Sequence, residues 1–225
     1  YADLERYKKA LKYCQQALEM RQILYTGNHL DIATSLNNLG TVYRGLKQNR
    51  EALECHQQAL EMRQILYIGN HLNIASSLNN LGAVYQDLGQ HEETLKYFKD
   101  SFAMKQALYT GNNSDIASSL YNLGTAYFNL KQKQEALKYY ERALEIYKTL
   151  DIGNHPIIAM TLNNLGVICS NLGQHREAVK WYQKGAEQGN VQAQYNLATK
   201  YDDGLGGAQD YQEAVKWYQK AADQG

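Results

Sequence analysis

Apolar side chains recur at steps of three and four residues along most of this chain. In one stretch this spacing puts six of them on one face of a helix spanning roughly residues 31–46: Ile32, Leu36, Leu39, Val42, Tyr43 and Leu46. A second stretch predicts a helix over roughly residues 49–67, and Lys47-Gln48-Asn49 makes a short turn between the two. The pattern therefore predicts a pair of antiparallel helices.

This helix pair is one copy of a tandem repeat. The motif Leu36-Asn37-Asn38-Leu39-Gly40 returns intact at residues 78–82 and 162–166, and with Tyr121 in its second position at 120–124, always 42 residues from its neighbouring copy. A constant period indicates a structural unit that packs mainly against its neighbours. We therefore predict an all-α fold, a right-handed superhelical α-solenoid of antiparallel helix pairs. Residues 1–25 match the second half of a repeat, so we expect the chain to start inside a longer array.

Glycine and polar residues punctuate the repeat. Gly40 and its equivalents lie mid-helix, where glycine costs about 1 kcal/mol against alanine, so we expect a neighbouring helix to approach closely there. Gly-Asn pairs begin at residues 27, 69, 111 and 153 and are predicted helix stops. Asp31, Asn73 and Asp115 follow them and are the expected N-caps of the next helices.

The phase changes after residue 166. Residues 178–189 nearly repeat at 214–225, a step of 36, and a glycine-rich loop at residues 204–207 lies between the two copies. The last part of the chain is thus predicted to be a related repeat with a longer loop.

The spacing Leu36-x2-Leu39-Gly40-x2-Tyr43, followed by Ala52-x3-His56-x2-Ala59, resembles the tetratricopeptide signature. The 42-residue period and the Gly-Asn-His loop are similar to the arrays of kinesin light chains and their bacterial relatives. The later segment is similar to the Sel-one-like repeat. The resemblance implies tetratricopeptide repeats over residues 1–188 and Sel-one-like repeats over 175–225, which share the helix at 175–188.

Composition narrows the class of partner. Lys+Arg and Asp+Glu both number 23, so the chain lacks the basic excess typical of proteins that bind nucleic acid or membrane surfaces. No apolar run of 18 residues predicts a membrane-spanning helix. Three scattered cysteines suit a reducing compartment, so we expect a cytoplasmic protein, or one in the host cytosol if it is a secreted bacterial effector.

No residue pattern predicts catalysis, a metal or a cofactor. His29, His71 and His155 occupy one phase of different repeats, too far apart to share an ion, and are expected to stabilise their turns. Gly204-Leu205-Gly206-Gly207 lacks the following Lys-Ser/Thr and the preceding strand of a phosphate loop. We therefore predict a protein that is not an enzyme.

The resemblance implies that the first helix of each pair lines a concave groove. The predicted groove residues are exposed positions of these helices: Asn37, Thr41, Arg44, Asn79, Gln86, Tyr121, Phe128, Asn163 and Ser170. Asparagine offers donors and an acceptor to an extended peptide backbone, although Asn37, Asn79 and Asn163 could instead bridge adjacent repeats. Arg44 is the one charged residue of the set, which favours an uncharged peptide.

The predicted function is a non-catalytic protein–protein interaction scaffold that binds an extended, uncharged peptide. Two alternatives stay open: a self-associating architectural repeat protein, and a regulatory or targeting arm of a larger bacterial effector or multidomain enzyme.

Overall fold

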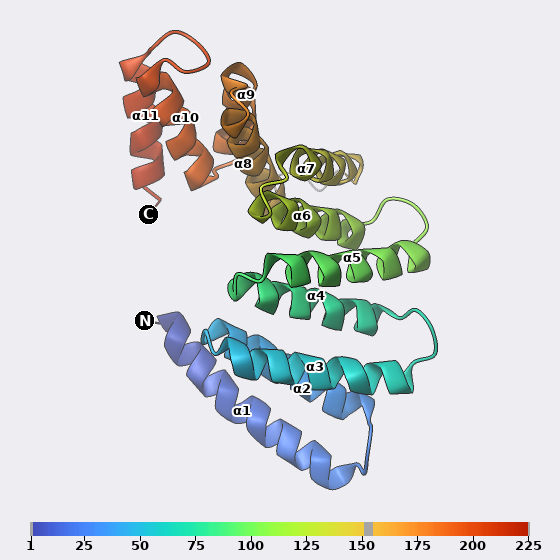
Figure 1. Ribbon diagram of the computed structural model, residues 1–225. Helices are drawn as coiled ribbons and strands as arrows, with labels where there is room; N and C mark the ends of the chain where they lie inside the picture. The colour runs from blue at the N-terminus through green and yellow to red at the C-terminus, as the bar shows by residue number, and fades with distance from the viewer. Residues whose placement is uncertain (1, 151–154, 225) are drawn as a thin grey trace. The chain divides into compact units, whose positions relative to one another are not determined.

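The computed structural model describes residues 2–150 and 155–224, and within these ranges it contains eleven α-helices and no strand (Figure 1). The chain divides into two compact units, residues 1–110 and 111–225, which are described one at a time. Unit 1 holds five helices: α1 Ala2–Leu24, α2 Leu30–Gly45, α3 Asn49–Leu66, α4 Leu72–Asp87 and α5 His91–Leu108. Unit 2 holds six: α6 Ser114–Asn129, α7 Lys133–Thr149, α8 Pro156–Asn171, α9 His175–Glu187, α10 Val191–Asp203 and α11 Tyr211–Ala222.

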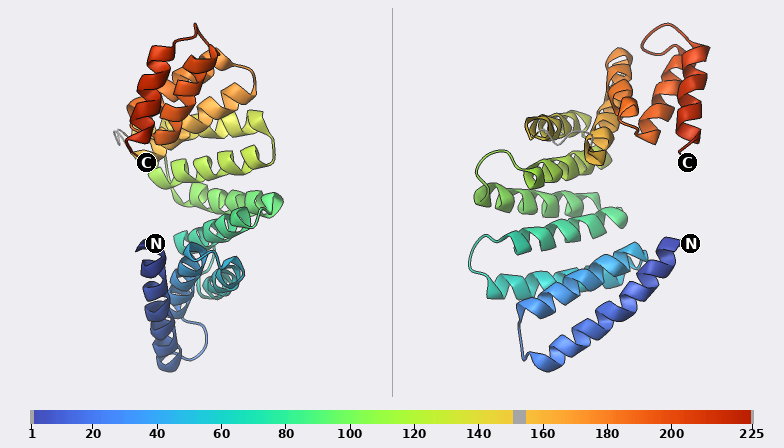
Figure 2. Two further views of the ribbon diagram at one scale, coloured as in Figure 1. Left: turned by 90° about the vertical axis from the view of Figure 1, so that its left-hand side faces the viewer. Right: turned by 180° about the vertical axis from the view of Figure 1, so that it is seen from behind.

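Each unit is a stack of antiparallel helix pairs (Figure 2). In unit 1, α2 pairs with α3 and α4 with α5, while α1 packs on α2. In unit 2 the pairs are α6 with α7, α8 with α9, and α10 with α11. The predicted all-α class of paired helices is confirmed, and the predicted helices 31–46 and 49–67 agree with α2 and α3 to within one residue. Over the described residues, no helix combines the length and apolarity needed to cross a bilayer.

A ring from the second helix covers the mid-helix glycine of the first helix in four pairs. A Cβ atom added at Gly40 would lie 2.8 Å from the His56 ring, and one at Gly166 would lie 2.5 Å from Tyr182. The same contact joins Gly82 to Phe98 and Gly124 to Tyr140. The close approach predicted from the repeating glycine is therefore confirmed, and its cause is a flat side chain lying where a methyl group would clash.

His56 is the one imidazole among these four rings. It is 1% exposed, and its Nδ1 atom is buried without a hydrogen-bond partner among the described residues. Burial lowers the pKa of His56 to about 4, and the positive charges of Arg44 and Arg63 add to this effect. The neutral imidazole is therefore the form that fits the folded state.

The N-caps differ from those predicted. Asp31, Asn73 and Asp115 do not cap their helices: each lies inside the helix and its backbone N–H donates to a residue two positions earlier. The acceptors are the true caps, His29 and His71 through Nδ1 at 3.2 and 3.1 Å, and Asn113 through Oδ1 at 2.7 Å. His155 caps α8 in the same way.

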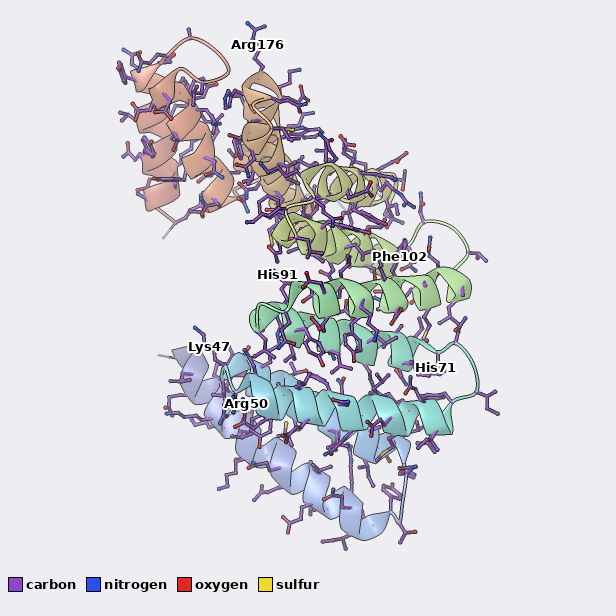
Figure 3. The ribbon with its side chains drawn as sticks, viewed as in Figure 1. Lys47, Arg50, His71, His91, Phe102 and Arg176 are labelled. Atoms are coloured by element: carbon purple, nitrogen blue, oxygen red, sulfur yellow. The ribbon has the colours of Figure 1, made fainter. Side chains whose placement is uncertain are left out.

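The capping histidines are also held by stacking. The Tyr25 ring lies 3.6 Å from His29 and the Tyr67 ring 3.5 Å from His71, both nearly parallel. Figure 3 shows His71 beside the end of α3, at the start of α4. These histidines were expected to stabilise their turns, and the structure shows how His29 and His71 do so. A tyrosine ring stacks on each imidazole, and its Nδ1, which must be unprotonated for this, accepts the capping hydrogen bond.

Left-handed backbone marks the predicted helix stops. Gly27, Gly69 and Gly111 have φ between 76° and 86°, which suits glycine. The fourth predicted stop, at Gly153-Asn154, lies outside the described residues. Two of the turns within helix pairs use the same geometry less favourably, because Lys47 and Lys131 have φ of 60° and 62°, whereas Gly89 and Gly173 occupy the equivalent turns of two other pairs.

Arginine side chains join successive pairs in unit 1. Arg63 on α3 is buried and donates to the Asn73 carbonyl at 2.9 Å and to the Ser77 hydroxyl at 2.7 Å on α4. Arg21 on α1 makes the equivalent bonds to α2. These bonds hold each second helix against the next first helix.

In unit 2, the segment with the shorter period packs directly on the tetratricopeptide-like helices. Trp217 of α11 and Leu197 of α10 share a buried core with Tyr182 of α9. The loop between α10 and α11 approaches the start of α9 so closely that a Cβ atom on Gly206 would lie 2.5 Å from the His175 carbonyl oxygen. One continuous core therefore spans the change of period.

Replacing His56 by phenylalanine should remove a pH dependence of stability. The unfolded histidine takes up a proton near its ordinary pKa of 6.5, and the folded one only near 4. The contribution of His56 to stability is therefore complete above about pH 6.5 and is lost toward pH 4, by up to about 3 kcal/mol at about 1.4 kcal/mol per pKa unit. His56→Phe introduces the residue found at the equivalent position of the next repeat, Phe98. The free energy of unfolding, measured with urea at several pH values in this range, should change less steeply with pH in this variant than in the wild type. The reverse variant Phe98→His should steepen it, and an unchanged slope in both would contradict the assignment.

His71→Ala should lower the free energy of unfolding by about 1 kcal/mol, the typical cost of losing an N-cap. His71→Asn should retain the cap, because Asn113 already performs this role one repeat later. Both variants lose the stacking on Tyr67, so their difference in chemical denaturation isolates the capping bond. Equal stabilities of the two variants would show that the bond contributes nothing.

Candidate functional site

The predicted ligand residues lie along the first helix of each pair, and we call this set of positions the first-helix face. In unit 1 it comprises five of the predicted residues: Asn37, Thr41 and Arg44 on α2, and Asn79 and Gln86 on α4. In unit 2 it comprises the other four: Tyr121 and Phe128 on α6, and Asn163 and Ser170 on α8. Spacings of three, four and seven residues put the members from each helix on one side of it.

The exposure of these residues is uneven. Thr41 and Arg44 are exposed, but most of the others are half-buried. Asn163 was expected to be exposed, and this is wrong: it is 8% exposed. The reason is that α10 packs against α8 and covers it, which the change of period concealed in the sequence.

Asparagine side chains bridge successive first helices. Asn80 on α4 donates its Nδ2 hydrogen to Oδ1 of Asn37 on α2 at 2.9 Å. In unit 2, Asn196 on α10 donates to Oδ1 of Asn163 on α8, also at 2.9 Å. The bridging role that the sequence left open is therefore present at Asn37 and Asn163. Since an amide carries two N–H donors besides its carbonyl, the bond at Asn37 does not use its donor capacity.

Arg44 is paired across the same face. Its guanidinium contacts the carboxylate of Asp87 on α4, with Nε 2.5 Å from Oδ2. Both side chains are more than one-third exposed, so the pair adds at most about 1 kcal/mol of stability. Its main effect is to cancel the one charge that the predicted residues of unit 1 bring to the face.

Tyr121, which replaces the first asparagine of the motif in this copy, lies beside a small cavity in unit 2. The cavity has a volume of about 120 Å³ and is lined by residues of α6, α7 and α8: Thr125, Phe128, Tyr140, Asn164 and Val167. Tyr121 stands beside it with its ring 5.4 Å from Tyr140 and tilted by 60°. For comparison, an apolar protein cavity of about 150 Å³ can hold benzene, so this space suits one apolar side chain.

The polar atoms around this cavity bond to one another. Asn164 donates to the hydroxyls of Tyr121 and Tyr140 at 3.3 and 3.2 Å, and the Thr125 and Tyr140 hydroxyls are 2.8 Å apart. Burial raises the pKa of Tyr121 and of Tyr140, so both phenols are neutral at physiological pH. A group entering the cavity would therefore gain mainly by burying apolar surface and would meet no charged side chain.

Ser170 lies one turn beyond the cavity wall on α8. Its hydroxyl hydrogen-bonds to Tyr182, where burial raises the phenol pKa to about 12 and the bond partly offsets the rise. Ser170 and Gln86 are both half-buried, so each presents only part of its side chain to a ligand.

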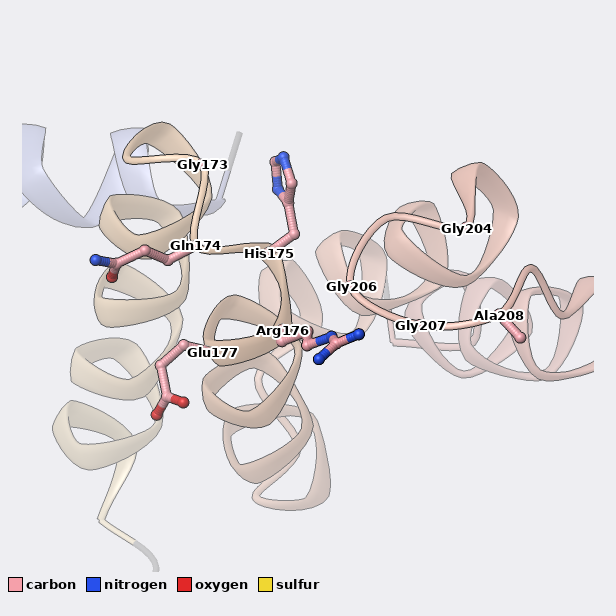
Figure 4. A pocket seen from close by; sticks show the side chains of 9 residues that line it. All are labelled: Gly173, Gln174, His175, Arg176, Glu177, Gly204, Gly206, Gly207 and Ala208. Atoms are coloured by element: carbon pink, nitrogen blue, oxygen red, sulfur yellow. The ribbon is translucent and has the colours of Figure 1, made fainter.

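A larger cavity of about 900 Å³ lies between the start of α9 and the glycine-rich loop (Figure 4). Its lining residues are Gly173 to Glu177 and four residues of the loop, and Arg176 extends toward Gly206 and Gly207. Four of its nine lining residues are glycine, and its polar side chains are those of Gln174, His175, Arg176 and Glu177. Among the described residues, no cluster of three or more His, Cys, Asp or Glu could hold a metal ion.

Sequence reasoning missed the residues that complete the face. Asp87, Tyr140, Asn80 and Asn164 were not predicted, although the last two occupy the second asparagine of the repeating motif. That asparagine is present in every copy, including the one where Tyr121 replaces the first. Its constancy was a signal of the bonds that Asn80 and Asn164 make to the preceding first helix.

Comparison with known proteins is consistent with this geometry. The family model described as tetratricopeptide repeat matches residues 1–65, 73–149 and 115–188, and the Sel1 repeat model matches residues 191–225. No curated protein sequence matches the chain.

Solved structures share the fold at low identity. BtubC (BKLC) from P. vanneervenii aligns with a TM-score of 0.80 at 17% identity, covering 96% of this chain and 90% of its own. A putative kinesin light chain from P. anserina with nearly identical TPR-like repeats gives 0.69 at 20% identity, covering 82% and 87%. YrrB, described as a TPR protein with an unusual peptide-binding site, gives 0.55 at 22%, covering 85% of each chain.

The asparagine bridge can be tested by a double-mutant cycle. Asn37→Ala and Asn80→Ala should each destabilise the protein, and the double variant should cost less than their sum by about 1 kcal/mol. Asn38→Ala is the matched control. Asn38 occupies the same motif position as Asn80, one repeat earlier, but it is exposed. Additive effects of Asn37→Ala and Asn80→Ala in urea unfolding would contradict the bridge.

Proposed function

The chain belongs to the tetratricopeptide repeat family, and from this premise we propose that it is a non-catalytic scaffold whose first-helix face binds an extended, uncharged peptide. Families with this fold are typically scaffolds without catalytic activity. YrrB is described by its peptide-binding site, and BtubC aligns over nearly the full length of this chain. These likenesses support the class of function, and the choice of ligand rests on the chain's own residues.

The observation that carries the proposal is the aromatic-walled cavity of unit 2. It is large enough for one apolar side chain, carries no charge, and has its polar atoms already bonded to one another. Phe128 and Val167 provide its apolar walls. A ligand side chain of the size of leucine or valine would bury itself there for about 1.5–3 kcal/mol.

The first-helix face of unit 1, taken by itself, offers neutral polar groups for a peptide backbone. Asn37, Thr41, Asn79 and Gln86 of unit 1 supply amides and a hydroxyl, and Arg44 is neutralised by Asp87. In unit 2, Asn163 and Ser170 are partly committed to internal bonds, so the apolar cavity carries more of the binding there. A strongly acidic ligand would find no unpaired cation among the predicted residues.

The proposal is tested by selecting binders from a phage-displayed library of random peptides and measuring their affinity by calorimetry. Selected peptides should be uncharged at their core and carry an apolar residue whose replacement by alanine weakens binding. Val167→Trp fills the cavity and should weaken binding about 10- to 100-fold, the equivalent of the lost burial energy. Selection of peptides with an essential acidic or basic core, or of no peptide at all, would overturn it.

A matched control guards against an indirect effect of the added indole. Val215 on α11 is 63% exposed, so Val215→Trp should leave affinity unchanged. Phe128→Ser introduces the residue found at the equivalent position, Ser170, and should weaken binding by removing a wall without blocking the space. Circular dichroism melting of all three variants confirms that they are folded. Equal affinity of wild type, Val167→Trp and Phe128→Ser would exclude the cavity as the anchor.

A further inference from the structure

The aromatic arrangement beside the cavity of α6 recurs on α10, in the segment with the shorter period. Tyr195 of α10 lies 5.5 Å from the ring of Tyr218 on α11, at an angle of 61°. The corresponding values for Tyr121 and Tyr140 are 5.4 Å and 60°. Both first-helix tyrosines begin the sequence Tyr-Asn-Leu, at 121–123 and 195–197. We call each arrangement an aromatic corner.

The hydrogen bonds of the two aromatic corners also correspond. The Thr199 hydroxyl donates to the Tyr195 carbonyl at 3.1 Å and lies 3.3 Å from the Tyr218 hydroxyl. Thr125 makes the same two contacts, to the Tyr121 carbonyl at 3.2 Å and to the Tyr140 hydroxyl at 2.8 Å. The second corner is therefore built by the same bonds, although its repeat differs in length.

Helix α8 joins the two helices that carry the aromatic corners, through hydrogen bonds between equivalent motif positions. Asn164 of α8 donates to Tyr121 of α6, and Asn196 of α10 donates to Asn163 of α8. Because the same motif positions are bonded at each step, Tyr195 occupies on α10 the position that Tyr121 occupies on α6. Both tyrosines therefore belong to the first-helix face of unit 2.

No charged residue of the described chain lines the cavity at either aromatic corner. A second cavity of about 510 Å³ adjoins Tyr195 and is lined by uncharged residues of α10 and α11: Val191, Gln192, Tyr195, Tyr218, Ala221 and Ala222. Between the corners, α8 offers Met160, which is 44% exposed, together with Val167 and Ser170. Asp202 lies seven residues after Tyr195 on α10, so the uncharged part of this surface comprises the two cavities and the α8 residues between them.

We propose that the corner on α10 is a second anchoring site for the same ligand, so that unit 2 binds an extended, uncharged peptide through two apolar side chains. One side chain enters the cavity beside Phe128, and the other packs on Tyr195 and Val191. The peptide backbone crosses α8 between them. This inference rests on the proposed function and extends the binding surface from the tetratricopeptide repeats into the Sel1 repeat.

The test uses peptides selected against the wild-type chain from the random library, with each peptide position replaced by alanine in turn. Two apolar positions should matter, at a fixed separation shared among independent peptides. Tyr195→Ala should weaken binding about 10-fold, and in this variant alanine at the second apolar peptide position should no longer lower the affinity. In Val167→Trp, alanine at the first apolar peptide position should no longer lower the affinity. Tyr211→Ala is the matched control, because Tyr211 is 61% exposed on α11 but lies outside both corners.

The outcomes separate this inference from the function on which it rests. If Val167→Trp weakens binding and Tyr195→Ala behaves like Tyr211→Ala, the ligand has one anchor, and only the second site is overturned. If neither Val167→Trp nor Tyr195→Ala affects any selected peptide, the proposed function fails as well. If Tyr195→Ala changes only a monomer–dimer equilibrium in light scattering, the α10 corner is a contact between copies of the chain, which also overturns the second site.

Discussion

The contact between a mid-helix glycine and the ring that covers it is the constraint on which each of the four helix pairs depends. A glycine in a helix interior is unfavourable by itself, so its recurrence must be compensated by packing. Here the missing Cβ at Gly40, Gly82 and their equivalents lets the second helix bring a flat side chain against the first helix backbone. The ring then sets the distance between the helices, and with it the position of every residue on the first-helix face.

The repeating Leu-Asn-Asn-Leu-Gly motif contributes to packing, to bridging and to the candidate site at once. Its leucines and glycine are buried, and its second asparagine bonds to the preceding first helix at Asn80 and Asn164. Only its first polar position varies, between Asn37 and Tyr121 in the examples described, and in both cases this side chain accepts the bridging bond. A change at this position can therefore alter the surface offered to a ligand without breaking the link between repeats.

The fold could be predicted from the sequence because a fixed period and a three-to-four spacing of apolar residues depend on local geometry alone. The first pair of helices was placed to within one residue for this reason. The caps could not be predicted in the same way. An aspartate after a loop is a common cap, but here the imidazole of His29 or His71, two residues earlier, accepts the capping bond and is stacked on a tyrosine ring. Of the predicted site residues in unit 2, Phe128 lines a cavity and Tyr121 contacts the cavity residue Tyr140, while a ligand role for any of them stays a prediction. The partners Tyr140, Asn164 and Asp87 come from other helices and needed three-dimensional packing to be found.

The bridges between first helices join residues that hold fixed places in the repeat, and this has a consequence for how the chain can change in length. Asn37 bonds to Asn80 and Tyr121 to Asn164, each pair separated by one period plus one residue. Duplication or loss of one complete 42-residue segment would recreate the same donor and acceptor at the new junction, whereas an insertion of any other length within a helix would misalign them. Such an array can be lengthened or shortened by recombination between its own similar copies, with the number of first helices changing in whole steps.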